Sequence, residues 1–131
     1  MITVFIKTES HYTVDRNRVR IIIEKILLSK GVKGKVEVSV SVVGDRLMKN
    51  LNRKYRNFDE TTDVLSFPMT EEVKDKPFVE PPDNVLRLGD IIISYPQARE
   101  DALEENKLVD DKIDELVEHS MLHLLGQHHE E

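Results

Sequence analysis

Hydrophobic and polar residues follow two different periods along the first third of the chain. Segment 35–43 carries a valine at every even position from 36 to 42, which is the two-residue period of a half-buried strand. The preceding segment repeats its apolar residues every three or four positions up to Lys30, so it predicts a helix. Thr13 or Asp15 is placed to cap the start of this helix, and Gly31 to end it. A β-branched and aromatic run, 2–8, predicts a strand before it.

The middle of the chain predicts a second helix and a third strand. Gly44 and Asp45 break the valine strand and open the helix. Its predicted inner stripe is Leu47, Met48, Leu51 and Tyr55. Segment 63–69 then reads as a compact apolar strand. Segment 70–83 contains charges and prolines, so we expect a long loop there.

The last third predicts one strand and two helices. Segment 88–94 is the strand, and Ser94 followed by Pro96 is typical of a helix start. That helix is predicted to run through about Leu108. The final helix is predicted from about Asp110 to Leu125, and it is apolar on most of its circumference in its second half. A helix with this pattern lies buried at the centre of a domain.

These elements predict the fold class. Their order is β-α-β-α-β-β-α-α, and 131 residues with 39% hydrophobic and 34% charged side chains suit one soluble domain. We therefore expect a single α+β domain over residues 1–131. It should have a mixed four-stranded sheet, helices mainly on one face and a central buried helix that bears a metal.

Charge and cysteine content narrow the function classes. The net charge of −6 argues against a protein that coats nucleic acid through its overall charge. The local balance differs, because 45–56 holds five basic residues against Asp45 alone. The absence of cysteine removes disulfides, thiolate metal sites and a cysteine nucleophile. We find no signal peptide and no membrane span, so a cytoplasmic location is the default expectation.

Four of the five histidines lie in residues 119–129. His119 and His123 are one helical turn apart and can aim two imidazoles at one point. Gly126 is placed to end the helix, so that His129 can return as a third nitrogen ligand. Three imidazoles with one open position are typical of a catalytic zinc ion, one per chain. The adjacent His128 stays an alternative as ligand, supporting group or bystander.

A metal site is not the only interpretation of a histidine-rich end. Surface histidines and expression tags also produce one, but there is no six-histidine repeat here and the first two histidines lie in an apolar helical pattern. The His-x-x-x-His-x-x-Gly-x-x-His spacing also occurs in metzincin peptidases, which carry a general-base glutamate directly after the first histidine. Ser120 stands at that position, and Glu118 points about 100° away on a helix. The peptidase interpretation therefore lacks its base.

Three segments together resemble the YbeY-type endoribonuclease family of rRNA maturation factors. They are the histidine run, the stretch 51–68 with its Thr-Asp-Val-Leu-Ser-Phe-Pro sequence, and the Leu-Gly-Asp-Ile strand at 88–94. The resemblance implies a cytoplasmic, metal-dependent, single-strand-specific endoribonuclease. It also implies a role in ribosomal RNA maturation and ribosome quality control, with ribosomal RNA, the small ribosomal subunit and ribosome-associated proteins as partners.

The resemblance carries over to individual positions. His119, His123 and His129 match the family's zinc ligands, and Arg56 matches its functional arginine. The segment 63–68 matches one wall of its cleft. Ser120 replaces the family's usual glycine, and Gln127-His128 replace its usual Tyr-Asp, so the shape of the cleft is expected to differ. The chain stops two residues after His129, where family members continue, so we expect a short or trimmed tail.

We therefore expect zinc to lower the pKa of its bound water to about 7 and Arg56 to offset charge on the phosphoryl oxygens. The alternative for Arg56 is a surface cation paired with Asp59. Expected substrate contacts are Arg53, Lys54, Asp63 and Ser66. Asp63 and Asp90 also suit structural roles, including orientation of an imidazole.

Two other functions share the histidine triad. One is a zinc hydrolase of a peptide or small phosphoester, and the other is a non-catalytic ribosome assembly factor. Few aromatic residues are available to stack bases, because Tyr55 and Phe67 are expected in the core.

Overall fold

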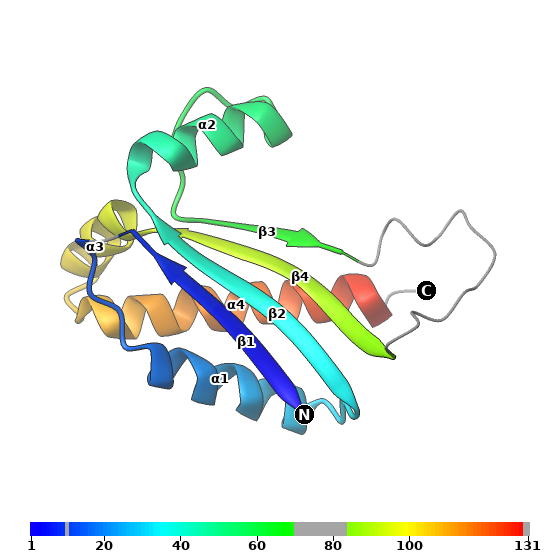
Figure 1. The fold of residues 1–131 in the computed structure, drawn as a ribbon. Coiled ribbons are helices and arrows are strands. Elements are labelled where there is room, and N and C mark those ends of the chain that lie inside the picture. Colours follow the sequence, from blue (N-terminus) through cyan, green and yellow to red (C-terminus); the bar gives the residue numbers. More distant parts are fainter. Residues whose placement is uncertain (10, 70–83, 130–131) are drawn as a thin grey trace.

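The computed structural model describes residues 1–9, 11–69 and 84–129, without the side chains of 127–129 (Figure 1). The elements are β1 (Ile2–Thr8), α1 (Arg16–Ser29), β2 (Lys35–Val43), α2 (Asp45–Arg56), β3 (Val64–Pro68), β4 (Val85–Ser94), α3 (Tyr95–Glu104) and α4 (Val109–His129). Their order is the one predicted from the hydrophobic pattern. The predicted loop 70–83 lies outside the described residues.

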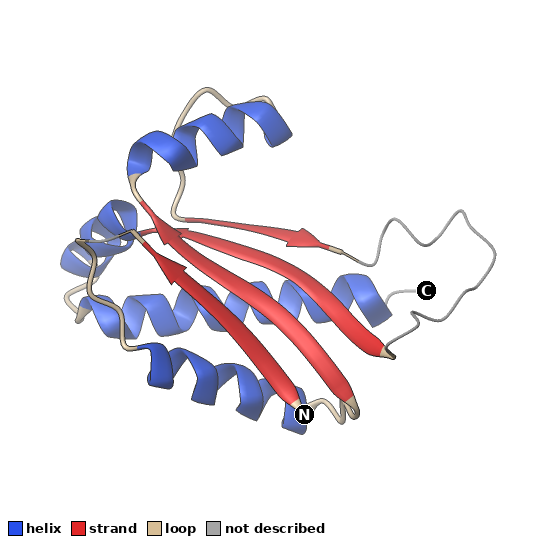
Figure 2. Ribbon diagram, viewed as in Figure 1, coloured by secondary structure: helices blue, strands red, loops and turns tan. Residues whose placement is uncertain are grey.

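The four strands form one mixed sheet in the order β1-β2-β4-β3. β1 and β4 both pair with β2 in parallel, and β3 pairs with β4 in antiparallel orientation. The mixed four-stranded sheet of the prediction is therefore confirmed. β3 lies at the edge of the sheet, so only one of its sides is paired within the described sheet (Figure 2).

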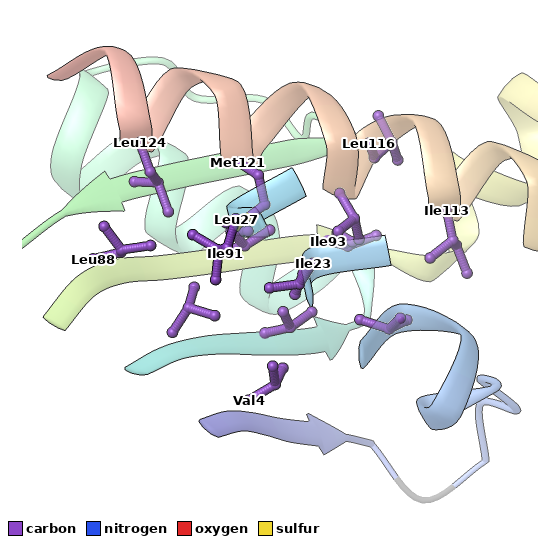
Figure 3. Close-up of a cluster of buried hydrophobic side chains, with 14 of the residues drawn as sticks. Val4, Ile23, Leu27, Leu88, Ile91, Ile93, Ile113, Leu116, Met121 and Leu124 are labelled. Atoms are coloured by element: carbon purple, nitrogen blue, oxygen red, sulfur yellow. The ribbon is translucent and has the colours of Figure 1, made fainter. Parts of the chain in front are cut away.

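Helices α1 and α4 lie against one face of the sheet, and α2 lies on the opposite face (Figure 1). The even-numbered valines of β2 point into the core beneath α1 and α4, as their alternation predicts. This core also takes Ile23 and Leu27 from α1, Ile91 and Ile93 from β4, and Met121 and Leu124 from α4 (Figure 3). A smaller cluster under α2 contains Val43, Met48 and Leu65. The arrangement confirms helices mainly on one face.

One predicted helix start is confirmed and one predicted helix end is shifted. Of the two predicted alternatives, Thr13 and Asp15, it is Asp15 that caps α1, and its side chain accepts a hydrogen bond from the Arg18 N–H. α3 ends at Glu104, four residues earlier than predicted, because Asn106 adopts the left-handed conformation with φ of 59°. Asparagine tolerates this conformation, which reverses the chain before α4 begins.

The predicted end of α4 is wrong. Gly126 does not stop the helix, which continues to His129, and Gly126 is not among the glycines with positive φ. Glycine costs only about 1 kcal/mol inside a helix, so it permits a stop without requiring one. No helix among the described residues is both long and apolar enough to cross a lipid bilayer.

Gly89 fixes the pairing of β3 with β4. Its φ of 145° is one that other residues rarely adopt, and a Cβ atom there would overlap the carbonyl oxygen of Phe67. Gly89 is the register partner of Pro68. The close approach of the two strands therefore explains the glycine of the Leu-Gly-Asp-Ile strand.

Candidate functional site

His119 and His123 lie on the solvent-exposed side of α4. The opposite side of the helix is buried against the sheet and consists of Ile113, Leu116, Val117, Ser120, Met121, Leu124 and Leu125. Both histidines are exposed, and their four-residue spacing places them one above the other. The burial pattern of α4 therefore leaves both histidines on the exposed side of the helix.

Ser66 of β3 holds the ring of His123. The Ser66 Oγ lies 2.7 Å from the His123 Nδ1. Ser66 is the register partner of Ile91, a residue of the core beneath α4, so it points to the same face of the sheet as α4. When Nδ1 carries the proton and donates to the hydroxyl, the lone pair of the ring is on Nε2. A histidine held in this way is suited to bind a metal through Nε2.

The third expected ligand is not placed. The side chain of His129 lies outside the described residues, as does that of His128. Among the side chains that the structure does describe, no three His, Asp or Glu residues are grouped for a metal. In a straight helix His129 would lie about 15 Å further along the axis than His119. Ligation by His129 therefore requires the chain to bend after Gly126.

Asp63 and Asp90 contact protein groups rather than the histidines. The Asp63 carboxyl lies near that of Asp101 of α3 and raises its pKa, and the Asp63 backbone carbonyl accepts a hydrogen bond from the Ser94 N–H. Asp90 accepts a hydrogen bond from Ser39 of β2. The sequence suggested that Asp63 and Asp90 orient an imidazole. In the structure it is Ser66 that contacts the imidazole of His123.

The contact with Asp63 changes the pKa of Asp101. Burial raises the pKa of the Asp101 carboxyl, and the hydrogen bond and negative charge of Asp63 raise it further. Lys112 acts in the opposite direction. This carboxyl pair joins the start of β3 to α3, whereas the Ser66–His123 contact lies at the middle of the strand.

The start of α2 is fixed to the sheet by Asp45. Its carboxylate accepts hydrogen bonds from Ser94 Oγ at 2.8 Å, Thr61 Oγ1 at 3.0 Å and Gln97 Nε2 at 3.3 Å. These partners come from β4, the segment after α2, and α3. The network orients α2 over the sheet and thereby sets the direction of its basic face.

The basic residues at the end of α2 have different partners. Arg53 pairs with Asp59 at 3.3 Å and with the Asn50 side chain at 3.1 Å. Arg56 instead lies over the ring of Phe58, 5.1 Å from its centroid. Among the described residues no carboxylate pairs with Arg56. The expected alternative for Arg56, a pair with Asp59, is thus made by Arg53.

The prediction that Tyr55 faces the core is wrong. Tyr55 is 57% exposed, with Lys54 Nζ 5.2 Å from the centroid of its ring. Its place on the inner stripe is taken by Asn52, which is buried and donates to the Glu60 carbonyl at 2.9 Å. Met48 and Asn52 are four residues apart, so a buried polar residue completes the stripe. An apolar pattern gives no signal for such a residue.

Strand β3 connects the two groups of candidate residues. On one face of the sheet, Phe67 contacts the Tyr55 ring with a centroid distance of 5.2 Å. On the other face, Ser66 contacts His123. Neighbouring strand residues point to opposite faces, so the aromatic end of α2 and the histidines of α4 lie on opposite sides of this edge strand.

Comparison with known proteins supports one family. The family model described as endoribonuclease YbeY matches residues 5–131. The protein is 38% identical to an endoribonuclease YbeY of Dehalococcoides mccartyi strain 195, over 99% of this chain and 78% of the relative. It is 40% identical to that of Moorella thermoacetica, over 83% of this chain and 70% of the relative.

The fold has a solved counterpart as well. The solution structure of TM1509 from Thermotoga maritima aligns with a TM-score of 0.59 and 29% identity, covering 94% of this chain and 72% of that one. Sequence match, fold match and the placement of the motif residues on β3 and α4 agree. The chain belongs to the endoribonuclease YbeY family.

Proposed function

We propose that this protein is a metal-dependent endoribonuclease that cleaves single-stranded ribosomal RNA in the cytoplasm. Its proposed role is in maturation and quality control of ribosomes, with the small ribosomal subunit and its associated proteins as partners. The observation that carries the proposal is the pair of exposed histidines on α4, one of them oriented by Ser66 at 2.7 Å, in a chain of the YbeY family.

The donor set suits zinc. His119 and His123 supply imidazole nitrogens, and His129 is the proposed third ligand of one ion per chain. Bound zinc supplies a Lewis acid and lowers the pKa of its water ligand to about 7. Other divalent transition metals accept the same ligands. Among the described residues, the hydrogen bond of His123 is made through Nδ1 to Ser66, which leaves Nε2 available for this purpose.

We assign the binding of RNA phosphates to the basic residues at the end of α2. Arg56, with no carboxylate partner among the described residues, is free to bind a phosphoryl oxygen pair with its planar guanidinium. Arg53 and Lys54 guide the RNA chain toward it. Asp63 and Ser66 are engaged with Asp101 and His123, so we assign them to the support of the site and the phosphate contacts to the three cations.

Elemental analysis with an RNA cleavage assay tests this function. The protein should bind about one zinc ion, cleave an unstructured RNA and spare its duplex, and lose activity on chelation and regain it with zinc. His119→Ala and His123→Ala should each lose metal and cleavage. His11→Ala, the histidine outside the motif, is the matched control and should retain both. Full zinc content in both motif variants would end the metal proposal.

The same samples separate the other two functions. Cleavage of casein with no cleavage of RNA would indicate a peptidase, although Ser120, at the base position of that class, is buried at 1% exposure. Tight zinc binding with no exchangeable water and no cleavage would indicate a non-catalytic assembly factor. A peptidase would make no use of the exposed cations at the end of α2, whereas an assembly factor that binds RNA would, so the cleavage assay decides between the nuclease and the assembly factor.

A further inference from the structure

We infer that the end of α2 is a stacking platform for unpaired RNA bases, formed by the rings of Tyr55 and Phe58. The inference rests on the proposed RNA substrate and names what the site recognises in it. Tyr55 is 57% exposed and Phe58 is 48% exposed. The only other aromatic ring with comparable exposure among the described residues is Phe5, at 51%, on β1.

The two rings are held by a defined turn. α2 ends in the left-handed residue Asn57, whose N–H donates to the Arg53 carbonyl at 3.2 Å, and the Phe58 N–H donates to the Asn52 carbonyl at 3.4 Å. The buried Asn52 side chain also holds the Glu60 carbonyl. The turn therefore fixes the backbone of Phe58 next to the last residues of α2, so this part of the chain does not need to be ordered when a ligand binds.

Each ring is paired with a cation. Lys54 lies 5.2 Å from the centroid of Tyr55, and Arg56 lies 5.1 Å from that of Phe58. Proteins that bind single strands combine aromatic rings, which stack on bases, with cations that bind the adjacent phosphates. Single exposed aromatic residues are common on protein surfaces. Two exposed rings three residues apart in the chain, each with its own cation from the last turn of the most basic helix of an acidic chain, match that combination.

The position of the two rings relative to the histidines sets the path of the bound RNA strand. Tyr55 contacts Phe67 on one face of β3, and Ser66 contacts His123 on the other. β3 is the edge of the described sheet, so a flexible strand can pass around it. Bases held at Tyr55 and Phe58 would then place a phosphate a few nucleotides away at the histidines. A duplex offers no free base faces to the platform, which accounts for selectivity toward single strands.

Binding assays on chelated protein isolate the platform from cleavage. The probes are an adenine strand of about ten nucleotides, an abasic strand of equal length and the corresponding duplex, measured by fluorescence anisotropy. The unaltered protein should bind the adenine strand about tenfold more tightly than the abasic strand. Tyr55→Leu with Phe58→Leu should abolish that preference, while affinity for the abasic strand stays the same.

Two controls test the role of the rings. Tyr55→Phe with Phe58→Tyr keeps both rings and should keep the preference, and Phe5→Leu removes an equally exposed ring elsewhere and should have no effect. Because the chain has no tryptophan, Tyr55→Trp is a fluorescence reporter that the adenine strand should quench and the abasic strand should not. A preference that survives the double leucine variant would overturn the platform. If the unaltered protein binds the adenine strand with this preference but does not cleave RNA, only the proposed function is overturned.

Discussion

Ser66 makes the one described contact to a candidate metal ligand. Its hydroxyl lies 2.7 Å from Nδ1 of His123, and groups that orient a metal-binding histidine typically contribute ten- to hundredfold to metal affinity, as an order of magnitude. We therefore expect Ser66→Ala to weaken zinc binding by at least about tenfold while the fold is retained. Competition with a chromophoric chelator measures the affinity.

Two variants control the Ser66 experiment. Ser66→Thr keeps the hydroxyl and should restore most of the affinity. Ser39→Ala removes a hydroxyl that bonds Asp90 and should leave zinc binding unchanged. Equal zinc affinity in Ser66→Ala and the unaltered protein would show that the hydrogen bond does not orient a ligand.

Asp101 makes stability depend on pH in a defined direction. Burial and Asp63 raise the pKa of Asp101 in the folded protein above its usual value, so the folded state binds the proton more tightly than the unfolded chain. Stability therefore falls as pH rises from the usual aspartate value through the raised one. Asp101→Asn should remove this loss and increase the free energy of unfolding at neutral pH.

Denaturant unfolding at several pH values checks the Asp101 prediction. The gain in Asp101→Asn should shrink as the pH falls below the usual aspartate pKa, because both states of the unaltered protein are then protonated. Glu24→Gln removes an exposed carboxyl on α1 and is the control. A gain that is the same at every pH would have to come from another source.

At the scale of elements, Gly126 decides how α4 ends. The helix continues to His129, and a Cβ atom at Gly126 would meet nothing within 4 Å. Gly126→Ala should therefore stabilise the metal-free protein by about 0.5–1 kcal/mol, the helix preference of alanine over glycine. If His129 binds zinc only when the chain bends there, the same variant should weaken zinc binding.

Thermal unfolding with and without zinc separates the two effects of Gly126→Ala. Gly89→Ala, at the close approach of β3 and β4, should instead lower stability in both conditions. Destabilisation of the metal-free protein by Gly126→Ala would mean that the helix ends at this glycine, as the sequence pattern first suggested.

The sequence predicted those elements whose hydrophobic period is uninterrupted. The alternating valines predicted β2 at its observed bounds, and the position of Asp15 offered the cap that α1 uses. The ends of α3 and α4 were predicted wrongly, because each depends on a residue that can be either helical or left-handed. Asn106 takes the left-handed form and ends α3 early, whereas Gly126 stays helical. The balance at such positions is set by tertiary contacts, which a local pattern does not contain.

The candidate site was predictable in its residue types but less so in its contacts. His119 and His123 could be paired from spacing alone, because a helix fixes their separation. Ser66 could be placed near them only through the antiparallel return of β3 beside β4, a long-range pairing. Tyr55 was misplaced because the buried polar Asn52 occupies the inner stripe.

At the scale of the whole molecule, charge is separated rather than balanced. The chain carries a net charge of −6, yet the last turn of α2 holds Arg53, Lys54 and Arg56 with Asp59 as the one carboxylate paired to them among the described residues. An acidic protein repels RNA from most of its surface. Binding at one basic end therefore selects the orientation of the strand relative to β3.

Salt dependence measures how many phosphates this basic end binds. Three cations at about 0.7 released counterions per phosphate on a single strand give a slope near −2 for the logarithm of the binding constant against that of the salt concentration. Arg53→Gln, Lys54→Gln and Arg56→Gln should each reduce the slope by about 0.7. Lys30→Gln, at the far end of α1, should leave it unchanged.

Because Arg53 must first give up Asp59, its variant should lose the least affinity of the three while changing the slope equally. Anisotropy titrations of chelated samples at several salt concentrations give the slopes of the unaltered protein and the four variants. An equal change in the Lys30 variant would mean that overall charge, rather than the end of α2, holds the RNA.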